Sequence, residues 1–153
     1  MRARKFLLVV GLCLVAAVCY GADSSMGTWK LNEAKSKIPH GMAKNKTVVY
    51  EAAGDNVKVT IDGVDAEGKP THNEWTGKFD GNDYPVTGSD QEDARAVKKI
   101  NEHSYTVTLK KDGQPAGAGH IVIAPDGKSR TVTIMRTGAD GKKVTSRSVY
   151  DKK

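Results

Sequence analysis

Cysteine is scarce in this sequence, and both copies, Cys13 and Cys19, lie near the start of the chain. If that first segment is removed, no thiol remains to form a disulfide, bind a metal or act as a nucleophile. Aromatic residues make up only 6% of the chain. We therefore expect a core built mainly from Val and Ile, which are residue types that favour strands.

Motifs for catalysis are also missing from the sequence. It has no Gly-x-Ser-x-Gly nucleophile turn and no phosphate-binding loop. The histidines are too far apart for a zinc pair on one strand or helix. The acidic groups at 80–83 and 90–93 do not fit a calcium loop of 12 residues, and we interpret them as a turn and a solvated loop. We predict a protein that is not an enzyme and needs no metal or cofactor. The histidines are His40, His72, His103 and His120.

Residues 1–22 have the three parts of a secretory signal peptide. Basic residues between positions 2 and 5 precede a 13-residue apolar stretch at 6–18, and the small residues Gly21 and Ala22 follow. Thirteen residues are short of the roughly 20 that cross a bilayer as a helix. We predict removal of residues 1–22 and export to the periplasm or outside the cell, with no membrane span afterwards.

Two alternatives to a cleaved signal remain. Residues 1–22 could stay as an uncleaved anchor. Cys19 could instead carry a lipid, but Val18 precedes it, where bacterial lipoprotein signals have Gly, Ala or Ser. We favour the cleaved signal over both.

The net charge falls on processing. The whole chain carries a formal +6, and loss of Arg2, Arg4 and Lys5 lowers this to +3. The remaining basic residues alternate with acidic ones and form no long stripe. Binding of nucleic acid needs clustered basic residues with aromatic side chains on which bases stack. We therefore predict no nucleic-acid partner.

From residue 46 onward, strand-like runs alternate with turn pairs that contain glycine. Asp-Gly suits a two-residue hairpin because both central residues of a type I′ turn need positive φ. The spacing of these pairs leaves room for one strand in each interval. The predicted turns are Gly54-Asp55, Glu67-Gly68, Asp80-Gly81, Asp112-Gly113, Asp126-Gly127 and Asp140-Gly141.

The strand-like runs predict an all-β protein, with residues 23–153 as a single domain. Period-two alternation, as at 56–62, is typical of a strand with one buried face. We expect an up-and-down antiparallel meander of about 8–10 strands. Closure into a barrel removes both free edges, so we favour it over a two-sheet sandwich. Asn32 is expected to cap one helical turn in a 32–45 loop that covers one mouth. The expected strands are 27–31, 47–52, 56–62, 71–79, 84–87, 94–100, 104–110, 116–124, 129–137 and 144–150.

The Gly27-x-Trp29 motif, followed by a meander, resembles the lipocalin and fatty-acid-binding (calycin-type) superfamily of barrels. The resemblance implies that Trp29 closes the barrel base and that Arg147, on the last strand, covers its ring. The chain also resembles a group of small exported bacterial proteins of unassigned function. That likeness rests on the GTWKLN-x-AKSK segment at 27–37 and the DGNDYPVTG segment at 80–88.

Four aromatic residues share the inward side of their expected strands: Tyr50, Trp75, Phe79 and Tyr105. Ligand pockets are usually apolar with a few polar anchors, and Arg136 has the same parity as its apolar strand neighbours. These five residues are our candidate ligand-binding site, with Arg136 pairing a ligand carboxylate. The alternatives are that the aromatic rings simply fill the barrel and that Arg136 reaches solvent at a mouth.

We therefore predict an exported, non-enzymatic barrel that binds a small apolar or amphipathic molecule in its interior. The alternative is a cell-envelope module that binds a protein or a glycan through loops and sheet surface. The 32–45 loop and the edge at Tyr84-Pro85 motivate that second interpretation. A protein partner cannot be named from the sequence.

Overall fold

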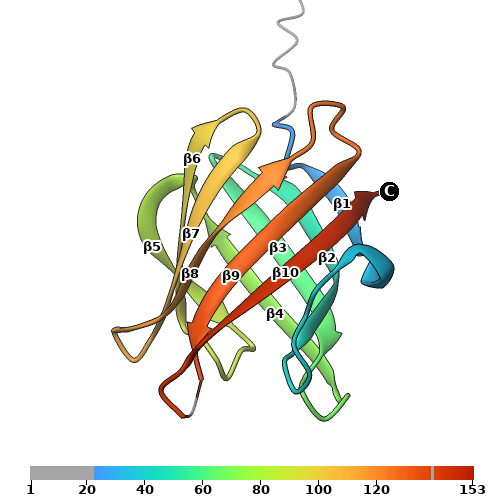
Figure 1. The fold of residues 1–153 in the computed structure, drawn as a ribbon. Coiled ribbons are helices and arrows are strands. Elements are labelled where there is room, and N and C mark those ends of the chain that lie inside the picture. Colours follow the sequence, from blue (N-terminus) through green and yellow to red (C-terminus); the bar gives the residue numbers. More distant parts are fainter. Residues whose placement is uncertain (1–22, 139) are drawn as a thin grey trace, which may run out of the picture.

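The computed structural model describes residues 23–138 and 140–153, which form one closed barrel of ten antiparallel strands (Figure 1). Each strand pairs with its neighbours in the sequence, and β1 pairs with β10 to close the ring. The barrel that the sequence predicts is confirmed, and the two-sheet sandwich is wrong. The predicted signal peptide at 1–22, with Cys19, lies outside the described residues.

All ten expected strands are present. Their bounds are β1 Gly27–Leu31, β2 Lys44–Ala53, β3 Asn56–Val64, β4 Pro70–Gly77, β5 Asp80–Thr87, β6 Ala94–Asn101, β7 Ser104–Lys111, β8 Gln114–Ile123, β9 Ser129–Thr137 and β10 Lys143–Lys152.

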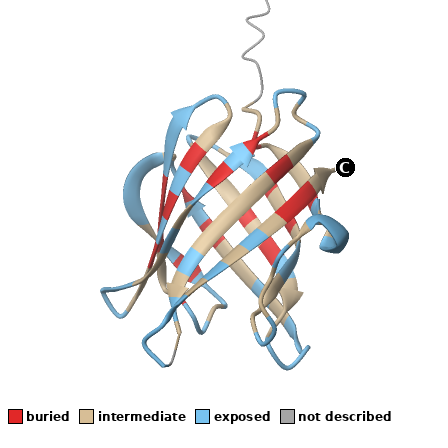
Figure 2. Cartoon of the chain, in the orientation of Figure 1, coloured by how far each residue is buried: buried red, intermediate tan, exposed pale blue. Residues whose placement is uncertain are grey.

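Alternating side chains give the barrel its core. On β7, Tyr105, Val107 and Leu109 are buried, whereas Thr106 and Thr108 between them are exposed. Figure 2 shows buried patches distributed around the barrel, separated by exposed and intermediate residues. Each strand thus contributes one face to a shared interior.

In the part of the chain that the structure describes, no helix has the length and apolar character needed to cross a membrane.

The turns follow the sequence prediction only in part. Asp112 and Gly113 have φ of 51° and 74°, as a type I′ turn requires, and Asp112 is the one non-glycine residue with positive φ among those described. Asp126 instead accepts a hydrogen bond from the Lys128 amide, which stabilises a longer loop. The predicted turn at Asp80-Gly81 is wrong, because both residues belong to β5.

The segment before β1 closes the barrel end near both described termini. The indole N–H of Trp29 donates to the Ser25 carbonyl at 2.7 Å, and both residues are buried. Asp23 accepts hydrogen bonds from the Tyr105 hydroxyl at 2.5 Å and the Lys99 ammonium at 2.6 Å. We call this the closed end. The opposite end, which we call the mouth, carries the loops at 65–69, 88–93 and 138–142.

The 32–45 segment lies elsewhere than expected. Asn32 does cap a short helical turn, η1 (Glu33–Lys35), by accepting from the Lys35 amide. The segment then packs along the outer side of β10 through a bridge between Lys37 and Arg147 (Figure 1). The prediction that it covers a mouth is therefore wrong: hydrogen bonds to β10 hold its first half on the side of the barrel.

Strands β4 and β5 make the weakest pairing of the ring. Only Glu74 with Thr87 and Trp75 with Val86 are paired in register. Beyond these two pairs, at the end of β4, Gly77 has no side chain and the Tyr84 ring occupies the space beside it. A Cβ at Gly77 would lie 2.5 Å from Tyr84 Cγ. An aromatic side chain thus replaces backbone pairing at this point.

Candidate functional site: the barrel interior

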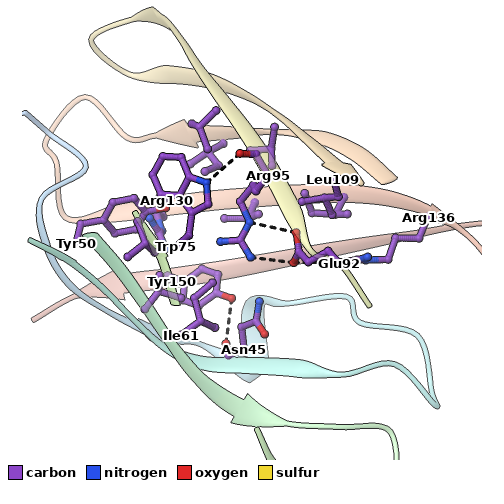
Figure 3. Close-up of a pocket in the computed structure, with 17 residues that line it drawn as sticks. Asn45, Tyr50, Ile61, Trp75, Glu92, Arg95, Leu109, Arg130, Arg136 and Tyr150 are labelled. Atoms are coloured by element: carbon purple, nitrogen blue, oxygen red, sulfur yellow. Dashed lines mark hydrogen bonds and ion pairs between the residues drawn. The ribbon is translucent and has the colours of Figure 1, made fainter. Parts of the chain in front are cut away.

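The interior of the barrel contains a cavity with a volume of about 90 Å³. Apolar side chains from β2, β3, β6, β7, β8 and β9 line its middle, and polar groups lie toward its two ends (Figure 3). The lining residues are Asn45, Val48, Tyr50, Val59, Ile61, Trp75, Glu92, Arg95, Val97, Val107, Leu109, Ile121, Arg130, Val132, Ile134, Arg136 and Tyr150.

Arg130 lies at the closed end of the cavity, and its side chain is only 3% exposed. Its guanidinium carbon lies 4.7 Å from the ring centroid of Trp29, 4.8 Å from that of Tyr50 and 5.0 Å from that of Tyr150. A cation is attracted to aromatic faces at such distances. Three rings from three strands therefore surround one buried charge.

The arginine that covers Trp29 is thus Arg130, and the prediction of Arg147 is wrong. Arg147 lies on the outer side of β10, where its Nη1 donates to the Lys35 carbonyl at 3.3 Å. Tyr150, three residues later, points inward and lines the cavity. Residues an odd number of positions apart on a strand face opposite sides, so Arg147 faces away from Trp29.

Gly27 and Trp29 occupy the positions that the resemblance implies. Gly27 has φ of +102°, a conformation that side chains of L-residues rarely adopt, and it starts β1. Two residues later Trp29 is fully buried at the closed end. The glycine allows the chain to turn into the strand, and the tryptophan fills the barrel base.

Tyr150 lies beside Arg130 and remains a neutral hydrogen-bond donor. Burial raises the pKa of Tyr150 to about 12, although the nearby Arg130 charge opposes that rise. Its hydroxyl donates to the Asn45 carbonyl at 3.0 Å. The phenol therefore does not neutralise the guanidinium.

Near the mouth, three charged side chains from two segments meet. Glu92 and Arg95 are 5% and 8% exposed, and they form a two-pronged ion pair. Arg136 Nη2 lies 3.6 Å from Glu92 Oε1. Burial lowers the pKa of Arg136, and the charge of Glu92 partly offsets this effect. The Glu92 carboxylate is therefore shared between the guanidinium groups of Arg95 and Arg136.

Glycines on β8 leave room for these side chains. A Cβ at Gly117 would lie 3.0 Å from Arg136 Cγ, and one at Gly119 would lie 2.9 Å from Ile134 Cδ1. Both glycines share the inward side with Ile121. The Arg136 side chain can thus lie along the inner wall.

The predicted ligand-binding residues divide into two groups. Tyr50, Trp75 and Arg136 line the cavity. Phe79 and Tyr105 do not line it; Phe79 stacks on Trp75 with centroids 6.3 Å apart, and it contacts the Tyr105 ring edge-on at 5.2 Å. Phe79 lies two residues beyond the end of β4, and it packs against the hydrophobic core without reaching the cavity. The interior is therefore part packed aromatic cluster and part open cavity.

Sequence reasoning missed Glu92, Arg95 and Arg130. Arg130 has the same parity as Val132, Ile134 and Arg136, so alternation along β9 was sufficient to identify it. Arg95 likewise shares the inward side of β6 with Val97. Glu92 gave no such signal, because it lies in a polar loop that we had interpreted as solvated.

Comparison of the sequence with models of known protein families and with curated proteins gives no match. Evidence for the function therefore has to come from the site.

Within residues 23–138 and 140–153, no group of three or more His, Cys, Asp or Glu side chains has a geometry that could hold a metal ion.

The interior has an excess of positive charge. Three arginines and one glutamate line the cavity: Arg95, Arg130, Arg136 and Glu92. Glu92 is shared between Arg95 and Arg136, and no carboxylate among the described residues pairs with Arg130, so the lining carries a net positive charge. An apolar cavity with such ends suits a small molecule that carries negative charge.

Proposed function

We propose that this protein is a non-enzymatic binder of a small amphipathic molecule, held in the barrel interior. The observation that carries the proposal is a mainly apolar cavity inside the barrel that has arginine side chains toward both ends. Burying a charge without a hydrogen-bonding partner costs free energy, so the buried Arg130 favours a binding role over a barrel interior that is only packed.

The size of the cavity limits the ligand. Pockets for drug-sized molecules usually span 300–1,000 Å³, whereas this cavity holds about 90 Å³. That volume suits a short aliphatic or single-ring compound rather than a long lipid chain.

The fold and the predicted export support this function. The closed barrel is compatible with a lipocalin-like form, and Trp29 beneath Arg130 matches the base closure that the resemblance implies. We propose that the protein belongs among these exported lipocalin-like barrels and that it acts as a carrier or scavenger outside the cytoplasm.

Binding of short amphiphiles to the purified protein tests the proposal. We expect hexanoate or 1-hexanol to bind with a Kd of about 1 mM or tighter, as measured by calorimetry and by the fluorescence of Trp75. Val132→Phe fills the cavity and should abolish binding. Val122→Phe, on the neighbouring strand, is the matched control because Val122 is exposed. If neither hexanoate nor 1-hexanol binds, the proposed function is overturned.

A further inference from the structure

The Arg130 side chain has hydrogen-bonding capacity that the protein does not use. Its Nε and Nη1 atoms are buried and have no hydrogen-bond partner among the described residues. The ion pairs beside the cavity belong to Arg95 and Arg136 instead. A guanidinium carries five N–H donors in one plane, so most of this group is unsatisfied.

The three surrounding rings do not replace an acceptor. The faces of Trp29, Tyr50 and Tyr150 attract the positive charge. The faces provide no lone pair, however, and neither Nε nor Nη1 of Arg130 donates to the Tyr150 hydroxyl, which itself donates to the Asn45 carbonyl. Donors that are buried without an acceptor cost free energy, so the site gains when a ligand supplies one.

The ligand chemistry follows from the shape of the group. A carboxylate accepts two parallel hydrogen bonds from one guanidinium, and such charge-assisted pairs are among the strongest hydrogen bonds in proteins. In Figure 3, Arg130 lies beside Tyr50 at one end of the cavity, and apolar side chains line the cavity beyond it. A molecule with one carboxylate and a short apolar body therefore matches both Arg130 at the closed end and the apolar lining of the cavity.

We propose that Arg130 is the anchor for the ligand, and that the natural ligand is a short-chain organic acid bound with its carboxylate at the closed end and its apolar body toward the mouth. This inference rests on the proposed function. It gives Arg130 two tasks, covering Trp29 and receiving the carboxylate. Arg136, partly exposed at the mouth, attracts the anion on entry.

Selectivity of the unmodified protein is the first test, and it needs no variant. The probes are hexanoate, 1-hexanol and hexylammonium, which share one chain and differ in charge. We expect hexanoate to bind at least tenfold more tightly than hexanol and hexylammonium to bind most weakly. If hexanol binds as tightly as hexanoate, the inference is overturned while the proposed function stands.

Substitution then locates the carboxylate. Arg130→Met preserves much of the side-chain volume and should lower hexanoate affinity at least tenfold while changing hexanol affinity less than threefold. Arg147→Met, on the outer side of β10, is the matched control and should change neither. If Arg136→Met removes the preference for hexanoate and Arg130→Met does not, the carboxylate lies at the mouth and the inference is wrong.

A spectroscopic measurement separates anchoring from a purely structural role. The Nε–H of Arg130 is buried and should give a protected NMR signal, assigned by its loss in Arg130→Lys. Hexanoate should shift that signal, and hexanol should leave it nearly unchanged. An equal response to both compounds would mean that Arg130 only covers Trp29. This readout also serves if Arg130→Met fails to fold.

Discussion

Arg95 holds Glu92 with two hydrogen bonds inside the barrel, from Nε at 3.2 Å and from Nη2 at 2.8 Å. Both side chains are buried, and each oxygen of the carboxylate receives one donor. Removing one partner of such a pair leaves the other charge buried and uncompensated.

We expect Glu92→Gln to destabilise the protein by about 3 kcal/mol, since breaking a buried pair from one side costs roughly that much. It would also leave Arg95 and Arg136 near each other without a carboxylate. Urea unfolding monitored by tryptophan fluorescence measures the change. The double variant Glu92→Gln with Arg95→Met should lose at least about 1 kcal/mol less than the two single losses added together. Strictly additive losses would mean that the pair contributes no coupling.

The Asp23 carboxylate should make the closed end sensitive to acid. Burial alone would raise the pKa of Asp23, but hydrogen bonds from Lys99, Tyr105 and Ser25 outweigh it and lower the pKa to about 2 from the usual 3.8. Because the folded value is the lower one, the carboxylate stabilises the fold above pH 4. This stabilisation fades as the pH falls from 4 toward 2.

Asp23→Asn should therefore remove about 2 kcal/mol at pH 7 and almost nothing at pH 2. Urea unfolding of both proteins at each pH gives the difference. Asp55→Asn, at an exposed turn, serves as the control for loss of one carboxylate. A stability difference that is equal at pH 7 and pH 2 would contradict the assignment.

Gly77 should not tolerate a side chain, although its backbone conformation suits other residues. A Cβ there would lie 2.5 Å from Tyr84 Cγ and 2.7 Å from Trp75 Cζ2. We expect Gly77→Ala to cost about 1–3 kcal/mol through overpacking and to change the near-ultraviolet circular dichroism of the aromatic cluster. Thr76→Ala, on the exposed side of β4, is the control. A Gly77→Ala protein with unchanged stability and spectrum would show that the rings move aside freely.

The strands could be predicted because period-two alternation is a local property. β3 and β7 show it in sequence, and glycine pairs separate β3 from both of its neighbours and β7 from β8. Ring closure also followed, since a long meander has two edges that only closure removes. The expected turn at Asp80-Gly81 failed because the chain reverses earlier, after Gly77, where an aromatic ring fills the gap.

The site was harder to predict because it depends on which side of a strand is covered. Val149 is buried on the outer side of β10, beneath the segment that holds η1, so burial does not mark the inward side of this strand. Arg147 shares that outer side, and the resemblance that assigned it to Trp29 relied on its place on the last strand, which does not tell which side it faces. Glu92 was missed for a related reason: Arg95 is only three residues away, but the folded barrel is needed to bury this pair and bring it against Arg136.

The pairing of β1 with β10 makes the ring depend on residues from its two ends. Trp29 lies opposite Lys152, about 120 positions away in the sequence. Contacts of such separation form late and slowly, because the intervening chain must first be ordered. Until β10 docks, β1 and β9 each have a free edge that could pair with another molecule. How quickly residues 143–152 dock thus determines how long the folding chain is exposed to aggregation.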